Sequence, residues 1–231
     1  SQCAGGHAGA AWSGLAAVAV RGRLSRASRC PVPALTGITR YNRGMPSLPI
    51  IHSTRPLEVA DARSDTELVD LEFSNGERRV YHRLRASGHG AVIIVPMRDA
   101  ETVILAREYA VGVERYLLGL PKGRLEPGES PAEGANRELK EELGFGARRL
   151  TVLHELSLSP AYMTYQAHVV LAQDLYPERR EGDEPEGLGM GPWKLADLHQ
   201  LIARDDVREG RSIAALFIAR EYLAGRYKPE R

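Results

Sequence analysis

Acidic side chains crowd into one short stretch of the chain, residues 121–145. Glu138, Glu141 and Glu142 lie within five residues of one another, and Glu129 lies shortly upstream. Like charges at helical spacing destabilise a helix by roughly a few tenths of a kcal/mol per pair, and a divalent cation relieves that repulsion. Carboxylates with no His or Cys nearby favour a hard ion, so the stretch predicts a Mg²⁺ or Mn²⁺ site. The alternative is an ordinary solvated face whose acids pair with neighbouring basic side chains.

The acids belong to a predicted helix. Ser130, Pro131 and Glu133 form a capping box with proline at the first helical position. Gly144 stands where a glycine commonly follows a helix, so we expect a helix over residues 131–143. The three glutamates fall within about 100° of one another, beside the apolar stripe that should pack on a sheet. That stripe is made of Ala132, Ala135, Leu139 and Leu143.

The remaining segments predict mixed layers of strands and helices. Residues 68–85 read as a β-hairpin around Asn75-Gly76, a pair favoured in two-residue turns because both positions tolerate positive φ. Residues 91–97 read as a buried strand, and we expect residues 102–110 to be its partner. Further strands are expected at 149–158 and 167–175, a polar acidic loop at 176–191, and helices at 195–206 and 212–225. This order indicates an α/β or α+β domain with a helix packed on the sheet.

Charge is divided unevenly along the 231 residues, although the net charge is only +1. Residues 1–44 hold six Arg and no Asp or Glu, which leaves 25 basic and 30 acidic residues elsewhere, a net charge of about −5. Phosphate neutralisation needs a basic excess, so we expect no nucleic-acid partner. Both cysteines, Cys3 and Cys30, lie in the same front segment. A body without cysteine fits a reducing compartment, and we expect a cytoplasmic protein.

The front segment, residues 1–44, contains an apolar run at residues 8–20 that is too short to span a bilayer. Its arginines follow that run, whereas a secretory signal places positive charge before it. An Arg-rich, acid-poor composition is typical of a transit peptide, and Met45-Pro46 is a plausible natural start. We expect no membrane association, and we expect residues 1–44 to be a disordered extension.

The acidic stretch resembles the Nudix box, G-x5-E-x7-R-E-U-x-E-E-x-G-U, in which U is a bulky apolar residue. Gly123, Glu129 and the run 137–145 match every fixed position. The resemblance implies hydrolysis of a nucleoside diphosphate linked to another moiety, with Mg²⁺ or Mn²⁺ as cofactor. It also implies site roles: Glu138 and Glu142 as metal ligands, Glu141 in the same catalytic cluster, the Lys122 carbonyl as a further ligand, and Arg137 with Glu129 as a supporting ion pair.

The same resemblance implies a fold and a division of the chain. The expected fold is α/β: a mixed sheet in an α/β/α sandwich, preceded by an N-terminal β-hairpin. The expected boundaries are residues 1–44 for the extension, 45–85 for the N-terminal strands and 86–231 for the Nudix domain. Relatives use such N-terminal strands to reach across a two-fold axis, so we expect a homodimer.

Residues beyond the box bear on the substrate. Pro160 matches a marker of ADP-ribose hydrolases, and Tyr162 matches a marker of diadenosine polyphosphate hydrolases. Residues 68–223 resemble the NudE-type branch, the ADP compounds hydrolases, which implies cleavage of ADP-ribose, NADH and diadenosine polyphosphates with AMP as one product. In other ADP-ribose hydrolases a Glu precedes the Leu-Pro of the turn that leads into the box. We call that turn, residues 119–123 here, the box turn, and this chain has Gly119 in place of the Glu.

Four more side chains are candidates by analogy with relatives. Arg107 and Glu108 follow a strand and are expected to bind substrate, the alternative being a salt bridge at the strand end. Glu184 and Glu186 resemble the E-x-E of a loop that supplies a base or an extra ligand, the alternative being a solvated loop. Two other functions remain open: hydrolysis of oxidised nucleoside triphosphates or nucleotide sugars, and nucleotide binding without catalysis.

Overall fold

The computed structural model of the chain describes residues 50–56, 65–86, 88–182 and 189–229. The predicted extension, residues 1–44, and the candidates Glu184 and Glu186 lie outside the described residues. The strands are β1 (Ile50–Pro56), β2 (Asp65–Glu72), β3 (Arg78–Arg85), β4 (Ala91–Pro96), β5 (Thr102–Ala110), β6 (Arg115–Gly119), β7 (Lys122–Arg124), β8 (Phe145–Ser157), β9 (Gln166–Pro177) and β10 (Gly189–Lys194). The α-helices are α1 (Pro131–Glu142), α2 (Leu198–Leu201) and α3 (Gly210–Leu223), with short 3₁₀ helices η1 (Val111–Val113) and η2 (Leu195–Asp197).

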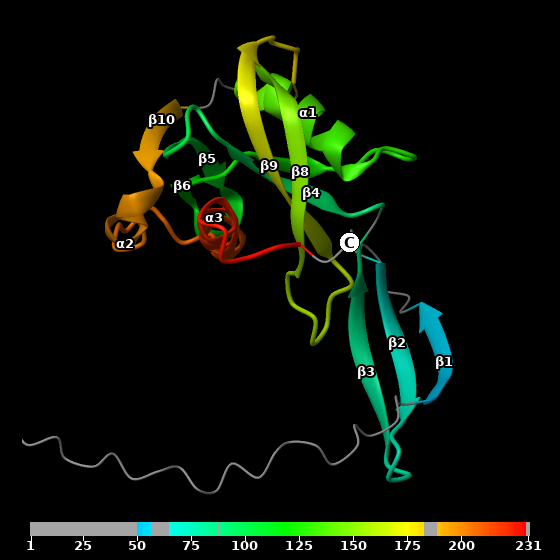
Figure 1. Ribbon diagram of the computed structural model, residues 1–231. Helices are drawn as coiled ribbons and strands as arrows, with labels where there is room; N and C mark the ends of the chain where they lie inside the picture. The colour runs from blue at the N-terminus through cyan, green and yellow to red at the C-terminus, as the bar shows by residue number, and fades with distance from the viewer. Residues whose placement is uncertain (1–49, 57–64, 87, 183–188, 230–231) are drawn as a thin grey trace, which may run out of the picture. The chain divides into compact units, whose positions relative to one another are not determined.

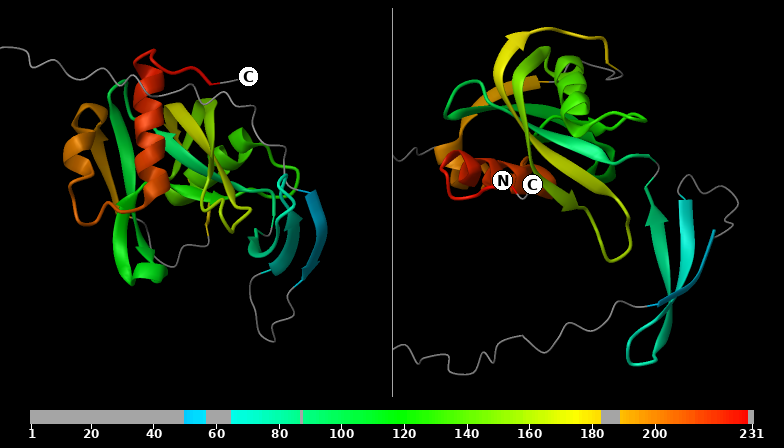
Figure 2. Two further views of the ribbon diagram at one scale, coloured as in Figure 1. Left: turned by 90° about the horizontal axis from the view of Figure 1, so that it is seen from below. Right: turned by 45° about the vertical axis from the view of Figure 1, so that its right-hand side comes forward.

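A four-stranded sheet in the order β7-β4-β9-β8 forms the middle layer, and its central strands β4 and β9 are parallel. Every residue of β4 is buried, which explains its continuous apolar sequence. Val92 and Ile94 pack toward α1, whereas Ile93 and Val95 pack toward α3. The two helices therefore cover opposite faces of this sheet, as Figures 1 and 2 show. The predicted α/β/α sandwich is confirmed.

One predicted strand pairing is wrong. Strand β5 does not run beside β4 as a ladder partner; it lies between β10 and β6 in a second sheet of order β10-β5-β6. The contact with the end of β4 is a single bridge, Met97 to Val103. Strand β4 instead receives β7 on one side and β9 on the other. Partner choice between strands depends on residues far away in sequence, and two adjacent apolar runs do not fix it.

The N-terminal hairpin is confirmed, and β1 adds a third strand to it in the order β1-β2-β3. Its turn is not the expected two-residue type. The Gly76 N–H donates to the Phe73 carbonyl at 2.9 Å, and Gly76 alone in this turn adopts a positive φ, +84°. The Asn75 carboxamide oxygen accepts from the Glu77 N–H at 3.0 Å. Asn75 therefore stabilises a longer loop through its side chain.

The expected helix over residues 195–206 is much shorter than predicted. Only Leu198–Leu201 is α-helical, after the 3₁₀ turn η2. Its apolar residues Leu195, Leu198 and Leu201 are buried in the core on the α3 side of the sheet. Apolar spacing thus identified the buried residues correctly and overestimated the length of the helix. No helix within the described ranges has the length and apolar content needed to cross a bilayer.

Candidate active site

Helix α1 begins and ends where its sequence predicts. The Ser130 hydroxyl accepts from the Glu133 N–H at 3.3 Å, and the Glu133 carboxylate accepts from the Ser130 N–H at 2.9 Å. Gly144 adopts a φ of +73° just past the helix end. Ala135 and Leu139 are fully buried against the sheet. These contacts fix the rotation of the helix, which turns its acidic edge toward the preceding loop.

The three glutamates of α1 lie in different surroundings. Glu142 is the most buried, and its Oε1 accepts from the Lys122 N–H at 3.2 Å. Burial raises the pKa of Glu142 to about 8, and the hydrogen bond from Lys122 opposes that rise. The Glu138 carboxylate packs against Gly123 so closely that a Cβ there would lie 1.9 Å from it. Glycine is therefore required at position 123 for Glu138 to keep its place.

Arg137 joins the acids to the loop before the helix. Its guanidinium donates to both oxygens of Glu129, at 2.9 and 3.0 Å, and to Glu138 and Glu141 at 2.8 and 3.1 Å. It also donates to the Arg124 carbonyl at 2.8 Å. The Arg137 side chain is only 15% exposed. Hydrogen bonding to Arg137 lowers the pKa of Glu129 despite its burial, and Glu129 in turn raises the pKa of Arg137.

Whether these residues fit a divalent cation depends on their donor atoms. Glu138, Glu141 and Glu142 offer only carboxylate oxygens, which are the donors that Mg²⁺ and Mn²⁺ prefer. Burial raises the pKa of the Glu142 carboxyl, and the charge of Lys122 only partly offsets that rise. Across the described part of the chain, no three acidic, His or Cys side chains already form a coordination sphere, and Arg137 holds Glu138 and Glu141. The donor set fits a hard cation.

The two candidates from β5 point to different partners. Glu108 forms an ion pair with the Lys122 ammonium, which brings it to the box turn. Arg107 donates to Asp206 at 2.7 Å, an exposed contact that Asp206 shares with Arg204. Successive residues of a strand face opposite sides. Of these two candidates, only Glu108 is connected to the acidic helix, through its ion pair with Lys122.

Pro160 and Tyr162 lie in the loop between β8 and β9, away from the contacts of the acidic helix. They line a cavity of about 670 Å³ together with apolar residues of the N-terminal sheet, among them Val69 and Tyr81. The Leu84 N–H donates to the Tyr162 carbonyl at 2.7 Å, which fastens β3 to this loop. The structure therefore associates both substrate markers with the N-terminal strands.

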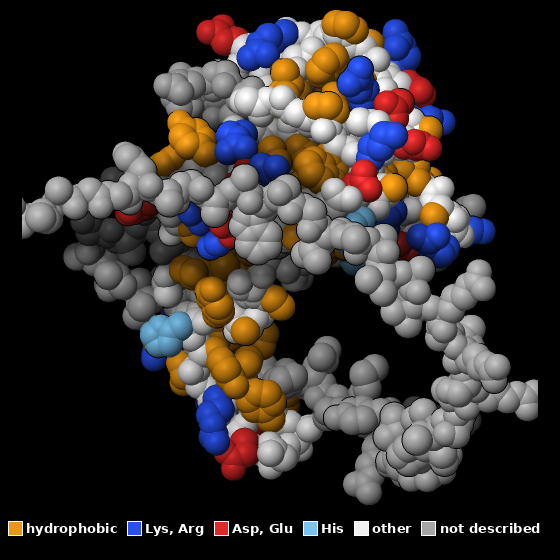
Figure 3. All heavy atoms as spheres, turned by 90° about the vertical axis from the view of Figure 1, so that its left-hand side faces the viewer, with side chains coloured by type: hydrophobic (Ala, Val, Ile, Leu, Met, Phe, Trp, Pro, Cys, Tyr) orange, Lys and Arg blue, Asp and Glu red, His pale blue; other side chains and the backbone are white. Residues whose placement is uncertain are grey.

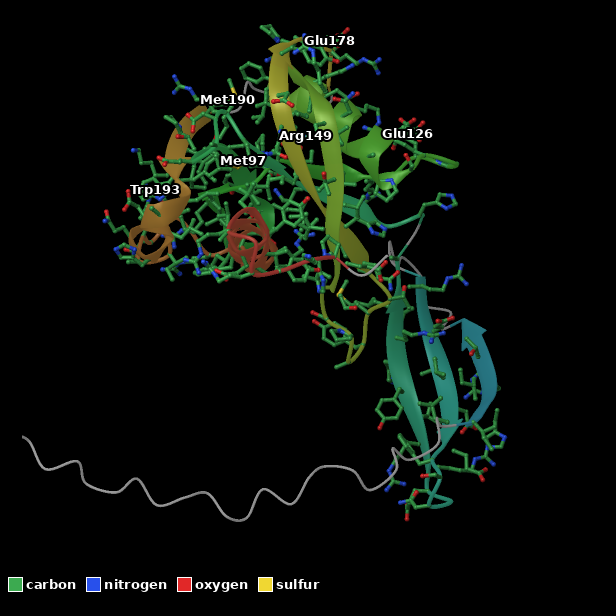
Figure 4. The ribbon with its side chains drawn as sticks, viewed as in Figure 1. Met97, Glu126, Arg149, Glu178, Met190 and Trp193 are labelled. Carbon is green, nitrogen blue, oxygen red and sulfur yellow. The ribbon has the colours of Figure 1, made fainter. Side chains whose placement is uncertain are left out.

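The segment after β9 runs along the end of α1. The Lys140 ammonium pairs with Glu178 at 2.9 Å, and the Arg180 N–H donates to the Lys140 carbonyl at 3.1 Å. Figure 4 labels Glu178 here and Glu126 in the loop before α1. A Cβ on Gly182 would lie 3.2 Å from the Glu141 Cβ. The described chain thus approaches Glu141 immediately before the loop that carries Glu184 and Glu186.

Sequence reasoning missed two polar residues at the start of α3. The Ser212 hydroxyl accepts from the Leu120 N–H at 3.0 Å, and the Glu209 carboxylate caps the helix by accepting from the Ser212 N–H at 2.7 Å. The signal was present: Glu209 stands three residues before Ser212, at the start of an apolar helical pattern. Placing the start of the helix at residue 212 concealed this cap.

Comparison with known proteins identifies the family. A model described as a NUDIX domain matches residues 88–217, and one described as a NudE-type Nudix hydrolase N-terminal domain matches residues 49–83. ADP compounds hydrolase NudE of Escherichia coli (strain K12) is 55% identical over 168 residues, covering 72% of this chain and 90% of that protein. ADP-ribose pyrophosphatase of Bacillus subtilis (strain 168) is 31% identical over 154 residues, covering 66% and 82%.

A solved structure agrees with these matches. A crystal structure of ADP compounds hydrolase superposes with a TM-score of 0.72 and 50% sequence identity, covering 78% of this chain and 97% of that one. The matched family region contains the whole of α1 and the turn that precedes it. With its capped acidic helix, its glycine-backed turn and these similarities, the chain belongs to the Nudix hydrolase family.

Proposed function

We propose that the protein hydrolyses the pyrophosphate linkage of ADP-containing compounds, namely ADP-ribose, NADH and diadenosine polyphosphates, and releases AMP with a divalent cation as cofactor. The observation that carries the proposal is the buried Glu142 beside Glu138, backed by the glycine turn at Gly123. The 55% identity to an ADP compounds hydrolase over 90% of that relative supports the substrate class.

In this proposal Glu138, Glu142 and the Lys122 carbonyl hold Mg²⁺ or Mn²⁺, with Glu141 in the same cluster. The ion, when bound, neutralises phosphate charge and lowers the pKa of a bound water. Arg137 keeps Glu138 and Glu141 aligned through its two hydrogen bonds. In the hydrolysis, water forms a new P–O bond, the bridging P–O bond breaks, and a base takes the proton of the water. From sequence, Glu184 stays the candidate base, with Glu186 as helper.

The test is a substrate panel resolved by product. ADP-ribose, NADH, diadenosine triphosphate, GDP-mannose and nucleoside triphosphates are each incubated with Mg²⁺ or Mn²⁺ and with a chelator. AMP together with ribose 5-phosphate from ADP-ribose is the expected result, and the chelator should abolish it. Pyrophosphate released from a triphosphate, or GMP from GDP-mannose as the main product, would move the enzyme to another substrate class within the family.

We also propose a homodimer. The N-terminal sheet exposes large apolar side chains that a monomer leaves in water, Ile51 and Tyr81 on one face and Ile50 and Val80 on the other. Figure 3 shows apolar side chains gathered on the surface of one face of the molecule. A patch of this kind is typical of a protein interface. Light scattering at micromolar concentration should give twice the chain mass of 25.4 kDa, and a monomer would reject this proposal.

The proposal includes a small-molecule substrate, no nucleic-acid partner and a cytoplasmic location. Support for the location comes from residues 45–231, which contain no cysteine. Fractionation of cells that express a tagged protein tests it, with activity expected in the supernatant after membranes are removed.

A further inference from the structure

The first turn of α3 contacts the box turn from the face of the sheet opposite α1. Ser212 is 2% exposed, and its hydroxyl accepts from the buried Leu120 N–H at 3.0 Å. Leu120 stands two residues before Lys122, whose N–H donates to Glu142. A further hydrogen bond holds the same turn: the Ile94 N–H donates to the Pro121 carbonyl at 2.9 Å. The box turn is therefore fixed to β4, α1 and α3.

Glu209 sets the direction of the Ser212 hydroxyl. Ser212 Oγ donates to a Glu209 carboxylate oxygen at 2.7 Å, which commits its single proton and leaves a lone pair for the Leu120 N–H. Burial alone would raise the pKa of Glu209, but hydrogen bonds from Arg211 and Ser212 lower it. The carboxylate is thus ionised at neutral pH, and a charged acceptor strengthens the bond from the hydroxyl.

Gly119 leaves room for this contact. A Cβ at Gly119 would lie 2.9 Å from Ser212 Oγ, closer than real Cβ contacts, and the next nearest atom, Ser212 Cβ, would be at 3.5 Å. The hydroxyl therefore occupies the space where a side chain at position 119 would begin. A cavity of about 140 Å³ adjoins this point and is lined by Gly119, Lys122, Glu209 and Ser212 together with Glu108 and Arg211.

We propose that Glu209 and Ser212 act as positioning residues for the turn that carries Lys122, so that the first turn of α3 sets the geometry of the metal site on the other side of the sheet. The inference rests on the proposed function for its effect on catalysis. Its structural part, the fixing of residues 119–122, stands without it. Neither residue touches the acidic helix in the contacts described above, so both act through Leu120.

The first test compares Ser212→Ala with Tyr227→Phe. The control also removes one hydroxyl that bonds to the main chain, since Tyr227 donates to the Leu153 carbonyl at 2.7 Å, away from the box turn. We expect Ser212→Ala to weaken Mn²⁺ binding in calorimetry about tenfold and to lower kcat by about the same factor. Hydrogen exchange of the peptide over residues 117–124 should speed up. Tyr227→Phe should change none of the three.

Wild-type Mn²⁺ affinity and wild-type exchange in Ser212→Ala would overturn the proposal, as would an equal loss in Tyr227→Phe. Hydrogen exchange needs neither substrate nor metal, so a failure of the proposed function leaves that readout intact, while Mn²⁺ binding tests the effect on the proposed metal site. Glu209→Gln provides a second variant should Ser212→Ala not fold. It keeps the shape of the cap and removes the charge, and we expect a smaller loss in the same direction.

A double-mutant cycle tests the contact itself. Gly119→Ala should weaken Mn²⁺ binding in the wild type, because the new methyl group displaces Ser212 Oγ. In the Ser212→Ala background that oxygen is gone and the nearest atom lies at an ordinary 3.5 Å, so Gly119→Ala should cost little. Strictly additive losses would show that the two positions act separately and would overturn the proposal.

Discussion

Two regions of the molecule differ in how well contacts within this one chain satisfy their side chains. The first is the box turn with α1, and the second is the N-terminal sheet with the loop around Tyr162. Around α1, charged groups are partly buried and bonded to one another: Arg137 donates hydrogen bonds to three glutamates. In the N-terminal sheet, Glu67 is buried against Arg83, but the ion pair of Arg78 with Asp70 is exposed, and apolar side chains such as Tyr81 face water. The first region is organised before any ligand arrives, whereas the second has surface left to cover.

The sharpest test of the acidic region is Glu142→Gln. The amide oxygen can still accept from Lys122, while one ligand charge is lost. We expect kcat to fall on the order of 1,000-fold. The metal-free fold should be at least as stable, because burial raises the pKa of Glu142 and so destabilises the folded state at pH 7, a cost that the uncharged amide does not carry. Turnover on the panel substrate and thermal unfolding measure the two effects. Glu178→Gln, at an exposed carboxylate, is the control. Unchanged turnover would remove Glu142 from the metal site.

Arg137→Gln tests whether the buried cluster also stabilises the fold. The change leaves Glu129, Glu138 and Glu141 without their common partner. Removing one member of a buried ionic cluster is strongly destabilising, so we expect the free energy of unfolding to fall by about 2–4 kcal/mol. Urea denaturation without metal measures it. Arg149→Gln breaks an exposed pair with Asp174 instead and should cost below about 0.5 kcal/mol; equal losses would contradict the comparison.

Glu129→Gln adds a pH signature. Because hydrogen bonding to Arg137 lowers the pKa of Glu129 below 4.5, its ionised form stabilises the folded state above that pH, and the contribution disappears as the pH falls through the lowered pKa. We expect the wild type to exceed the variant by about 1–2 kcal/mol at pH 7. The gap should be constant above pH 5.5 or so and shrink below about 4.5. A gap that persists at pH 3 would assign the stabilisation to packing.

Asp70→Asn tests the N-terminal sheet and should give the smallest loss of stability among the tested carboxylates and arginines, controls aside. Asp70 accepts from Arg78 at 2.8 Å, a distance as short as any in the Arg137 cluster, but the arginine is 55% exposed. Water and salt screen such a pair, so we expect a stability loss below about 1 kcal/mol that vanishes in 1 M salt. A salt-independent loss as large as that of Glu129→Gln would show that the two regions do not differ in this respect.

The acidic site could be predicted from sequence because its parts are local. Ser130, Glu133 and Gly144 fix the ends of α1, and the helical period then places Glu138 and Glu142 without knowledge of the rest of the chain. The order of apolar patterns indicated mixed layers of strands and helices, and the resemblance to the Nudix box implied the α/β/α sandwich. Site roles stay predictions, since the contacts describe where the side chains lie and not what they bind.

What could not be predicted depends on contacts between distant segments. One of the two partners of β5 is β10, more than eighty residues later, and no local pattern encodes that choice. The role of Ser212 requires knowing that α3 lies against the box turn. The prediction of a two-residue turn at Asn75-Gly76 was wrong for another reason. The same two residues suit several loop lengths, and the strand register selects one of them.

The parallel pairing of β4 with β9 has a consequence for synthesis of the protein. All the acids of α1 have been synthesised once residue 142 is added, yet the parallel partner of β4 begins only at Gln166, and the serine that bonds to Leu120 is residue 212. A nascent chain therefore carries the carboxylates of α1 long before it can hold them in place. Enzyme activity should emerge late in translation and in a single step, when α3 docks.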